Sequence, residues 1–138
     1  MKKSGFLIII IMSMLFFKGS FAQSSQPKQI VKTVNSVESA GMIKKNLKNK
    51  NFVILDVRTP QEYAEGHLAN AANIDFNGSD FAQKIGKLDK SKTYLVYCRS
   101  GHRSASAVEI MKSQSFQTIY NLDGGITKWT TDNHPIVK

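Results

Sequence analysis

The sequence predicts an α/β fold, with a small, mainly parallel sheet of about five strands flanked by helices. Two observations support this prediction. Short apolar runs rich in β-branched and aromatic residues recur along the chain, and segments with helical periodicity lie between them. Continuous apolar runs are typical of strands that are covered on both faces, as in parallel sheets. The candidate strands span residues 52–55, 72–74, 94–97 and 118–120.

Helical patterns fill the intervals between these runs. The first candidate helix is defined by apolar residues at helical spacing, namely Val37, Ala40, Ile43 and Leu47. The second is expected to begin at Thr59, which can cap it, with Glu62 placed for a capping box. Pro60 suits the first helical position, and Gly66 is expected to end the helix.

Three further helices are expected downstream, at 79–88, at 104–112 and from 125 to 129. The one at 104–112 directly follows the only cysteine of the chain and should pack against the sheet. Its expected inner stripe consists of Ala105, Val108 and Met111.

The sequence divides into three segments. Residues 1–22 are typical of a secretory signal peptide, because their apolar run at 6–17 is far shorter than the roughly 20 residues of a spanning helix. An uncleaved anchor is the alternative, which Lys18 disfavours by closing the run early. Residues 23–32 are expected to be a flexible leader and 33–138 the folded domain. We therefore expect an exported protein, periplasmic or secreted, without stable membrane insertion after cleavage.

The charge balance gives no sign of a nucleic-acid partner. The chain has 19 Lys and Arg against 10 Asp and Glu, a formal net charge of +9. These basic residues are scattered, so we expect a solvated basic surface that helps to attract small anions. Cys98 is the only cysteine. An unpaired cysteine in an oxidising compartment is either buried and inert or reactive.

The residues around Cys98 favour a reactive thiol. Cys98 follows the candidate strand 94–97, and open α/β sheets bind ligands at the carboxyl ends of their strands. Gly101 permits the loop to turn back, so that its N–H groups and the next helix N-terminus can form an anion cradle around the sulfur. Such surroundings lower a thiol pKa. Positive charge at the mouth is supplied by Arg99, His102 and Arg103.

Three segments together resemble the rhodanese family, of the single-domain, exported thiosulfate sulfurtransferase type. They are 55–74 (LDVRTPQEY…GHLANAANI), 98–104 (CRSGHRS) and 122–129 (LDGGI and Trp129), which follow the family's order. The resemblance implies a small parallel sheet flanked by helices. It also implies sulfane sulfur transfer through a cysteine persulfide, with no metal and no organic cofactor. The implied partners are a small anionic sulfur donor such as thiosulfate and a cyanide or thiol acceptor, which can be a protein thiol.

The resemblance also assigns site residues by position. Cys98 is the implied catalytic nucleophile. The implied substrate-binding residues are Arg99, Ser100, Gly101, His102, Arg103 and Ser104. Asp56 and Arg58 are expected to support the loop from the strand-to-helix connection beside it. Asn70 departs from the pattern, because many members have glycine there.

Other conspicuous residues are expected to be structural. Arg58 and Glu62 lie close together across the strand-to-helix turn and are expected to pair. The glycines Gly124 and Gly125 are expected to form a turn, and Trp129 to pack in the core. Of these residues, only Arg58 is assigned to the site, in its supporting role.

Two other functions remain open. A cysteine phosphatase or arsenate reductase also holds a thiolate in an anion loop closed by an arginine, with five residues between the two. Four residues separate Cys98 from Arg103, which makes a narrower cradle that suits a sulfur atom better than a phosphate tetrahedron. The second alternative is a non-catalytic rhodanese-like binding module, which Cys98 disfavours because inactive members usually lack the cysteine.

Overall fold

The computed structural model describes residues 27–138 together with Gly19 and Ser25. The predicted signal peptide, residues 1–22, lies outside the described residues except for Gly19. Within the described part of the chain, no helix is both long and apolar enough to cross a membrane. Export and signal cleavage therefore stay predictions.

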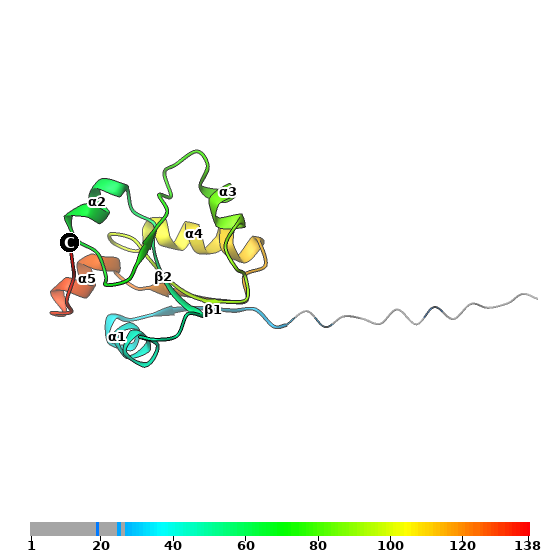
Figure 1. Ribbon diagram of the computed structural model, residues 1–138, viewed down its shortest axis with the longest axis horizontal. Coiled ribbons are helices and arrows are strands. Elements are labelled where there is room, and N and C mark those ends of the chain that lie inside the picture. The colour runs from blue at the N-terminus through cyan, green and yellow to red at the C-terminus, as the bar shows by residue number, and fades with distance from the viewer. Residues whose placement is uncertain (1–18, 20–24, 26) are drawn as a thin grey trace, which may run out of the picture.

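A five-stranded parallel sheet forms the centre of the fold (Figure 1). Its strands are β1 (Ile30–Val34), β2 (Phe52–Asp56), β3 (Ala72–Asn73), β4 (Thr93–Tyr97) and β5 (Thr118–Leu122). They lie in the order β1-β5-β4-β2-β3, and every pairing between neighbours is parallel. The predicted sheet is thus confirmed. Because β4 is central, the residue that follows it, Cys98, lies in the middle of the carboxyl edge.

The sheet begins earlier than the sequence suggested. We expected the folded domain to start near residue 33, but β1 starts at Ile30 and pairs with β5 along its whole length. The last residues of the expected leader therefore belong to the sheet. The strand escaped prediction because the exposed Lys32 interrupts its apolar pattern, and an edge strand tolerates such exposure.

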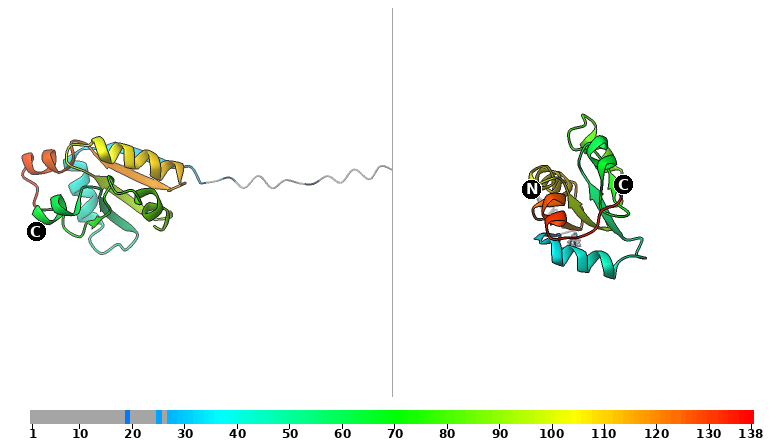
Figure 2. Two further views of the ribbon diagram at one scale, coloured as in Figure 1. Left: turned by 90° about the horizontal axis from the view of Figure 1, so that it is seen from above. Right: turned by 90° about the vertical axis from the view of Figure 1, so that its left-hand side faces the viewer.

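Helices cover both faces of the sheet (Figures 1 and 2). On one face α1 (Ser36–Lys45) and α5 (Gly125–Thr131) pack around a cluster that contains Leu95 and Trp129. On the other face α3 (Phe81–Gly86) and α4 (His102–Ser113) pack around a cluster that contains Val96 and Met111. The remaining helix, α2 (Pro60–Glu65), follows β2 at the carboxyl edge. Both faces of the central strands are therefore buried, as their apolar runs require.

The predicted start of α2 is confirmed. The side chain of Thr59 accepts a hydrogen bond from the backbone N–H of Glu62 at 3.2 Å, and the Glu62 carboxylate accepts one from the N–H of Thr59 at 3.1 Å. This reciprocal pair is a capping box, with Pro60 at the first helical position. It fixes the direction in which the Glu62 side chain leaves the helix.

Two predicted helix stripes were partly wrong. In α1, Ala40 and Ile43 pack against the sheet cluster, whereas Val37 is 70% exposed and Leu47, beyond the helix end, is 66% exposed. In α4, Ala105 is exposed, because the buried stripe follows the spacing of Ser104, Ala107, Val108 and Met111 and leaves Ala105 at its edge.

Asn70 adopts the left-handed backbone conformation, with φ +64°. This explains why asparagine can stand where the family often has glycine, since these two residue types tolerate the conformation best. We expect Asn70→Gly to change the free energy of unfolding by less than about 0.5 kcal/mol and Asn70→Ala to lower it by about 1 kcal/mol. Urea unfolding of the two variants measures this difference. Equal stability of the two variants would contradict the explanation.

Candidate active site

Cys98 lies directly after β4, at the carboxyl edge of the sheet. The loop from Cys98 to Gly101 connects β4 to α4 and lies between the neighbouring strands β2 and β5. The Cys98 side chain is only 1% exposed and belongs to the cluster on the α4 face. Because a buried strand precedes the sulfur and a helix follows it, the sulfur is held in a fixed position.

The loop wraps hydrogen-bond donors around the sulfur. The backbone N–H of Gly101 points to Cys98 Sγ at 3.1 Å, in a turn that gives Gly101 a φ of +105°, a value that favours glycine. The Cys98 thiol donates to Ser104 Oγ at 3.4 Å, and Ser104 Oγ donates to the Gly101 carbonyl at 3.1 Å. Gly101 and Ser104 thus lie beside the sulfur, as the sequence suggested.

The pKa of the Cys98 thiol is lower than that of an ordinary cysteine. Burial raises this pKa, but the hydrogen bond between the sulfur and the Ser104 side chain, together with those from the backbone N–H groups of Ser104, Gly101 and Ser100, outweighs the effect of burial. These donors stabilise the thiolate, and the N-terminus of α4 adds a favourable field. The sulfur is therefore suited to act as a nucleophile.

The first turn of α5 holds the back of this loop. The carbonyl of Cys98 accepts the N–H of Ile126 at 2.9 Å, and the carbonyl of Arg99 accepts the N–H of Thr127 at 3.1 Å. A Cβ atom at Gly125 would lie 2.4 Å from the Cys98 carbonyl oxygen, so only glycine fits. Because α5 binds these two carbonyls, they point away from the sulfur, and the N–H groups of the loop can turn toward it.

Sequence reasoning missed this role of Gly125. We expected the two glycines of the LDGGI segment to serve only as a turn. A pair of glycines in front of a short helix was the available signal, because glycine marks places where two backbones approach closely. The partner backbone could not be identified without the fold.

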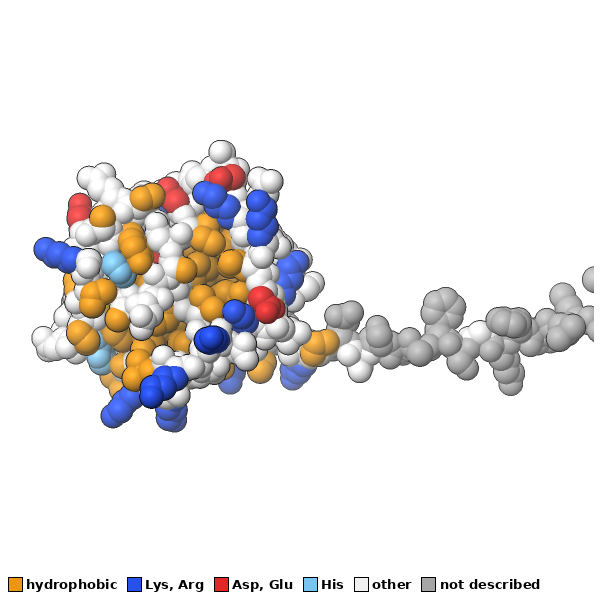
Figure 3. Space-filling model, viewed as in Figure 1, with side chains coloured by type: hydrophobic (Ala, Val, Ile, Leu, Met, Phe, Trp, Pro, Cys, Tyr) orange, Lys and Arg blue, Asp and Glu red, His pale blue; other side chains and the backbone are white. Residues whose placement is uncertain are grey.

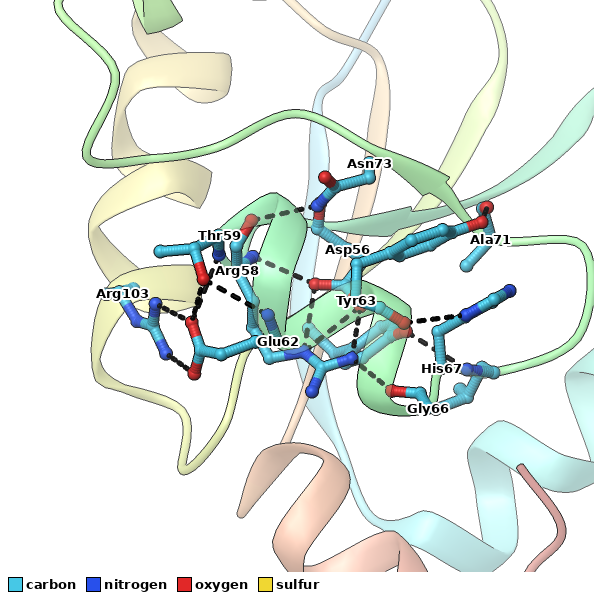
Figure 4. A network of polar contacts seen from close by, with 12 residues as sticks. Asp56, Arg58, Thr59, Glu62, Tyr63, Gly66, His67, Ala71, Asn73 and Arg103 are labelled. Carbon is cyan, nitrogen blue, oxygen red and sulfur yellow. Dashed lines mark hydrogen bonds and ion pairs between the residues drawn. The ribbon is translucent and has the colours of Figure 1, made fainter. Parts of the chain in front are cut away.

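Arg103 is bound by Glu62 (Figure 4). Its two terminal nitrogens donate to the two carboxylate oxygens of Glu62, at 2.7 Å from Nη1 and 2.8 Å from Nη2. The expected pairing of Glu62 with Arg58 is wrong, because the capping box directs Glu62 away from Arg58 and toward α4. The ion pair therefore joins α2 to the cysteine loop.

The Glu62–Arg103 pair makes a prediction about acid stability. The Arg103 hydrogen bonds lower the pKa of Glu62 from 4.5 to about 2. A depressed carboxyl pKa stabilises the fold above the unfolded value near 4.5, and this contribution is lost as the pH falls toward 2. Because the pair is partly solvated, we expect Glu62→Gln to cost about 1 kcal/mol at pH 7 and much less at pH 2.5.

Urea unfolding at pH 7 and at pH 2.5 checks this prediction. Asp89→Asn is the matched control, because Asp89 is an exposed carboxylate whose hydrogen bonds go to its neighbour Ser91 rather than to another element. A cost for Glu62→Gln that is the same at both pH values would show that the pair contributes nothing through the charge of Glu62.

Asp56 and Arg58 form a buried ion pair beside the loop. Arg58 Nη2 lies 2.7 Å from Asp56 Oδ2, and both residues are at most 5% exposed. The same nitrogen donates to the Gly66 carbonyl at 2.7 Å, and Asn73 Nδ2 donates to the carbonyls of Asp56 and Arg58. These contacts fix the β2–α2 connection, and the supporting role of Asp56 and Arg58 toward the cysteine loop stays a prediction.

The remaining loop side chains point outward. Arg99, Ser100 and His102 are exposed, and none of their side chains makes a hydrogen bond within the described part of the chain. The structure does not place the His102 ring on the sulfur. Arg99 lines an open pocket of about 420 Å³ between α2 and α5. The predicted site residues therefore divide into those around the sulfur, those bound to other elements and those at the rim.

The visible basic side chains do not form one patch. Figure 3 shows Lys and Arg side chains at separate places over the visible face, with hydrophobic and uncharged side chains between them. Such a distribution is typical of a solvated surface. No group of three or more His, Cys, Asp or Glu side chains is placed to hold a metal ion among the residues that the structure describes.

Comparison with known proteins agrees with this geometry. The profile of the Rhodanese-like domain matches residues 39–132. The chain is 34% identical over 104 residues to the thiosulfate sulfurtransferase GlpE of Coxiella burnetii (strain RSA 493 / Nine Mile phase I), covering 75% of this chain and 91% of that protein. It is 29% identical over 104 residues to a sulfurtransferase of Allochromatium vinosum, covering 75% and 95%.

A solved structure shows the same fold. The crystal structure of a rhodanese-related protein from Thermoplasma volcanium superposes with a TM-score of 0.64 and 33% sequence identity, covering 77% of this chain and 97% of that chain. The matched range of the family, residues 39–132, includes the cysteine loop.

Proposed function

The chain belongs to the rhodanese-like domain family, and we propose on this premise that it transfers sulfane sulfur through a persulfide on Cys98. Relatives of this chain are named sulfurtransferases, which supports a function of the sulfurtransferase type at the level of the family. The finer proposal concerns the mechanism and the substrates. The donor is a small anion such as thiosulfate, and the acceptor is cyanide or a thiol.

The proposed reaction has two displacements. The Cys98 thiolate attacks the outer sulfur of thiosulfate, a new S–S bond forms, and sulfite leaves with the electron pair of the broken S–S bond. The acceptor then attacks the outer sulfur of the persulfide, and Cys98 leaves as a thiolate. Cyanide becomes thiocyanate, and a thiol becomes a persulfide.

One observation carries the proposal. The Cys98 sulfur is buried, yet it receives the Gly101 N–H at 3.1 Å and its pKa is lowered. A buried thiol without a chemical role would have a raised pKa, because burial disfavours the thiolate. The same donors can stabilise the negative charge of a persulfide, as in other preorganised anion sites.

The spacing of the loop supports sulfur transfer over phosphoryl transfer. Four residues separate Cys98 from Arg103, and both terminal nitrogens of Arg103 are bound to Glu62. A non-catalytic binding module would not explain why hydrogen-bond donors surround the buried Cys98 sulfur. We further propose that the protein acts outside the cytoplasm, periplasmic or secreted, a proposal supported by the sequence character of residues 1–22.

Intact mass spectrometry tests the proposed mechanism. The reduced protein is mixed with thiosulfate and freed of the excess reagent. We expect a gain of about 32 Da, one sulfur atom, that disappears when cyanide is added. If reduced protein gains no mass from thiosulfate or from a small organic persulfide, the mechanism is wrong.

A further inference from the structure

The open pocket between α2 and α5 adjoins the cysteine loop. Arg58 and Glu65 line it from the side of β2 and α2, and Arg99 lines it from the cysteine loop. The α5 wall includes Thr127, whose N–H binds the Arg99 carbonyl at 3.1 Å. The turn that holds the loop therefore also forms one wall of the pocket. At about 420 Å³, the pocket has the size of a small-molecule site.

Arg58 offers this pocket an unused donor. Its guanidinium is buried, with Nε and Nη2 committed to Asp56 and to the Gly66 carbonyl. Nη1 donates to no atom of the described residues, and in Figure 4 one guanidinium nitrogen carries no dashed line and points toward the salmon-coloured α5. A buried guanidinium held by its other nitrogens is a preorganised donor for an anionic group.

Two charged side chains at the pocket, one positive and one negative, have no ion-pair partner among the described residues. Arg58 is paired with Asp56, and Glu62 is paired with Arg103. Arg99 and Glu65 are exposed, and neither forms an ion pair with another described residue. A ligand that carries one carboxylate and one ammonium group matches these two charges.

We propose that this pocket binds the sulfur acceptor and that the acceptor is a small zwitterionic thiol of the amino-acid type. Arg99 and Arg58 Nη1 receive the carboxylate, and Glu65 receives the ammonium group. This proposal rests on the proposed function, because it assigns the acceptor of the same reaction. It places the acceptor beside the loop and not within it.

The pocket is lined by Arg99, the neighbour of Cys98, and not by Cys98 itself. Since Cys98 is 1% exposed, an acceptor meets the outer sulfur of the persulfide and not Sγ itself. The acceptor thiolate attacks that outer sulfur and forms a new S–S bond, while the bond to Cys98 breaks and Cys98 keeps its electron pair as a thiolate. The proton lost by the acceptor thiol goes to solvent. No oxidant or reductant is needed.

Amide NMR with thioether analogues tests the pocket without any sulfur transfer. S-methylcysteine has both charges, 3-(methylthio)propionate has only the carboxylate, and 2-(methylthio)ethylamine has only the ammonium group. We expect S-methylcysteine to shift the amides of Gly66 and Thr127 in the whole folded protein. Arg99→Gln should weaken the two carboxylate analogues about tenfold, a typical loss for one charge-assisted contact. Glu65→Gln should weaken the two ammonium analogues about threefold, because an ion pair at an exposed carboxylate contributes little.

Lys44→Gln is the matched control for the loss of one positive charge, because Lys44 is exposed on α1, outside this pocket. It should leave all three affinities unchanged. Single-turnover transfer from the persulfide form to cysteine links binding to acceptor use. The cysteine concentration at half-maximal rate should rise in each variant by the same factor as the dissociation constant.

The outcomes separate this inference from the proposed function. A protein that gains sulfur from thiosulfate but shows no shifts here, or equal affinities in all variants, overturns the pocket and leaves the proposed function standing. A protein that binds S-methylcysteine but takes up no sulfur overturns the proposed function, and the acceptor role with it. Binding that depends on Arg99 alone overturns the zwitterionic class.

Discussion

Replacing Cys98 by serine is expected to abolish sulfur transfer, the largest loss that any single substitution in this chain should cause. A serine hydroxyl is not ionised at neutral pH and forms no persulfide, so the gain of about 32 Da with thiosulfate should disappear. Thiocyanate formation from thiosulfate and cyanide should fall to the rate without protein. Both readouts are measured on the same purified sample.

The fold of this variant should survive. The new Oγ replaces Sγ in the same buried space and can accept the N–H of Gly101, so we expect a loss of stability below about 2 kcal/mol. Ser104→Ala is the comparison variant, because it keeps the nucleophile and removes one hydrogen bond to it. That variant should still transfer sulfur, with its pH–rate profile displaced upward because the pKa of Cys98 rises. Transfer by folded Cys98→Ser would sink the mechanism.

Gly125→Ala is expected to have the second-largest effect, although the residue never touches the sulfur. A Cβ atom there would lie 2.4 Å from the Cys98 carbonyl oxygen and 2.6 Å from the Arg99 carbonyl oxygen. The backbone φ is also +58°, so the substitution is strained as well as overpacked. We expect a loss of about 2–4 kcal/mol in stability. Because the loop must shift, persulfide formation should slow about 100-fold.

Gly124→Ala separates the effect on the loop from the effect on stability. Its φ is +69°, close to that of Gly125, but its added Cβ would meet the Lys128 side chain at 2.5 Å and not the loop. Both variants should unfold at lower urea concentration. Only Gly125→Ala should lose transfer per folded molecule, measured below the unfolding transition. Equal transfer by the two folded variants would show that α5 does not shape the loop.

The central part of this site could be predicted because it is local in sequence. A buried strand, a cysteine, a glycine turn and a helix start follow one another between residues 94 and 104. Each is specified by its own residues, and their order alone brings Gly101 and Ser104 to the sulfur. The same holds for the capping box of Thr59 and Glu62, which spans one turn.

Contacts between distant segments could not be predicted in this way. Arg103 and Glu62 are 41 residues apart, and only the position of α2 beside the loop selects this pair over the nearer Arg58. Gly125 looked like an ordinary turn residue because its partner, the Cys98 carbonyl, lies on another element. The strand at Ile30 was hidden because an edge strand is stabilised by its pairing with β5 and not by its own apolar pattern.

The position of β1 determines which side of the molecule faces a surface to which the protein is attached through the residues before Ile30. All strands are parallel, so Ile30 enters the sheet at the amino end, whereas Cys98 lies at the carboxyl end of β4. Figure 1 accordingly shows residues 27–29, directly before β1, on the side away from α2. Whatever is joined directly upstream of Ile30, such as an affinity tag, a fusion partner or a resin, attaches at the edge of the sheet opposite the cysteine loop. Attachment there leaves the mouth of the loop facing solution, so immobilised protein should remain open to small substrates.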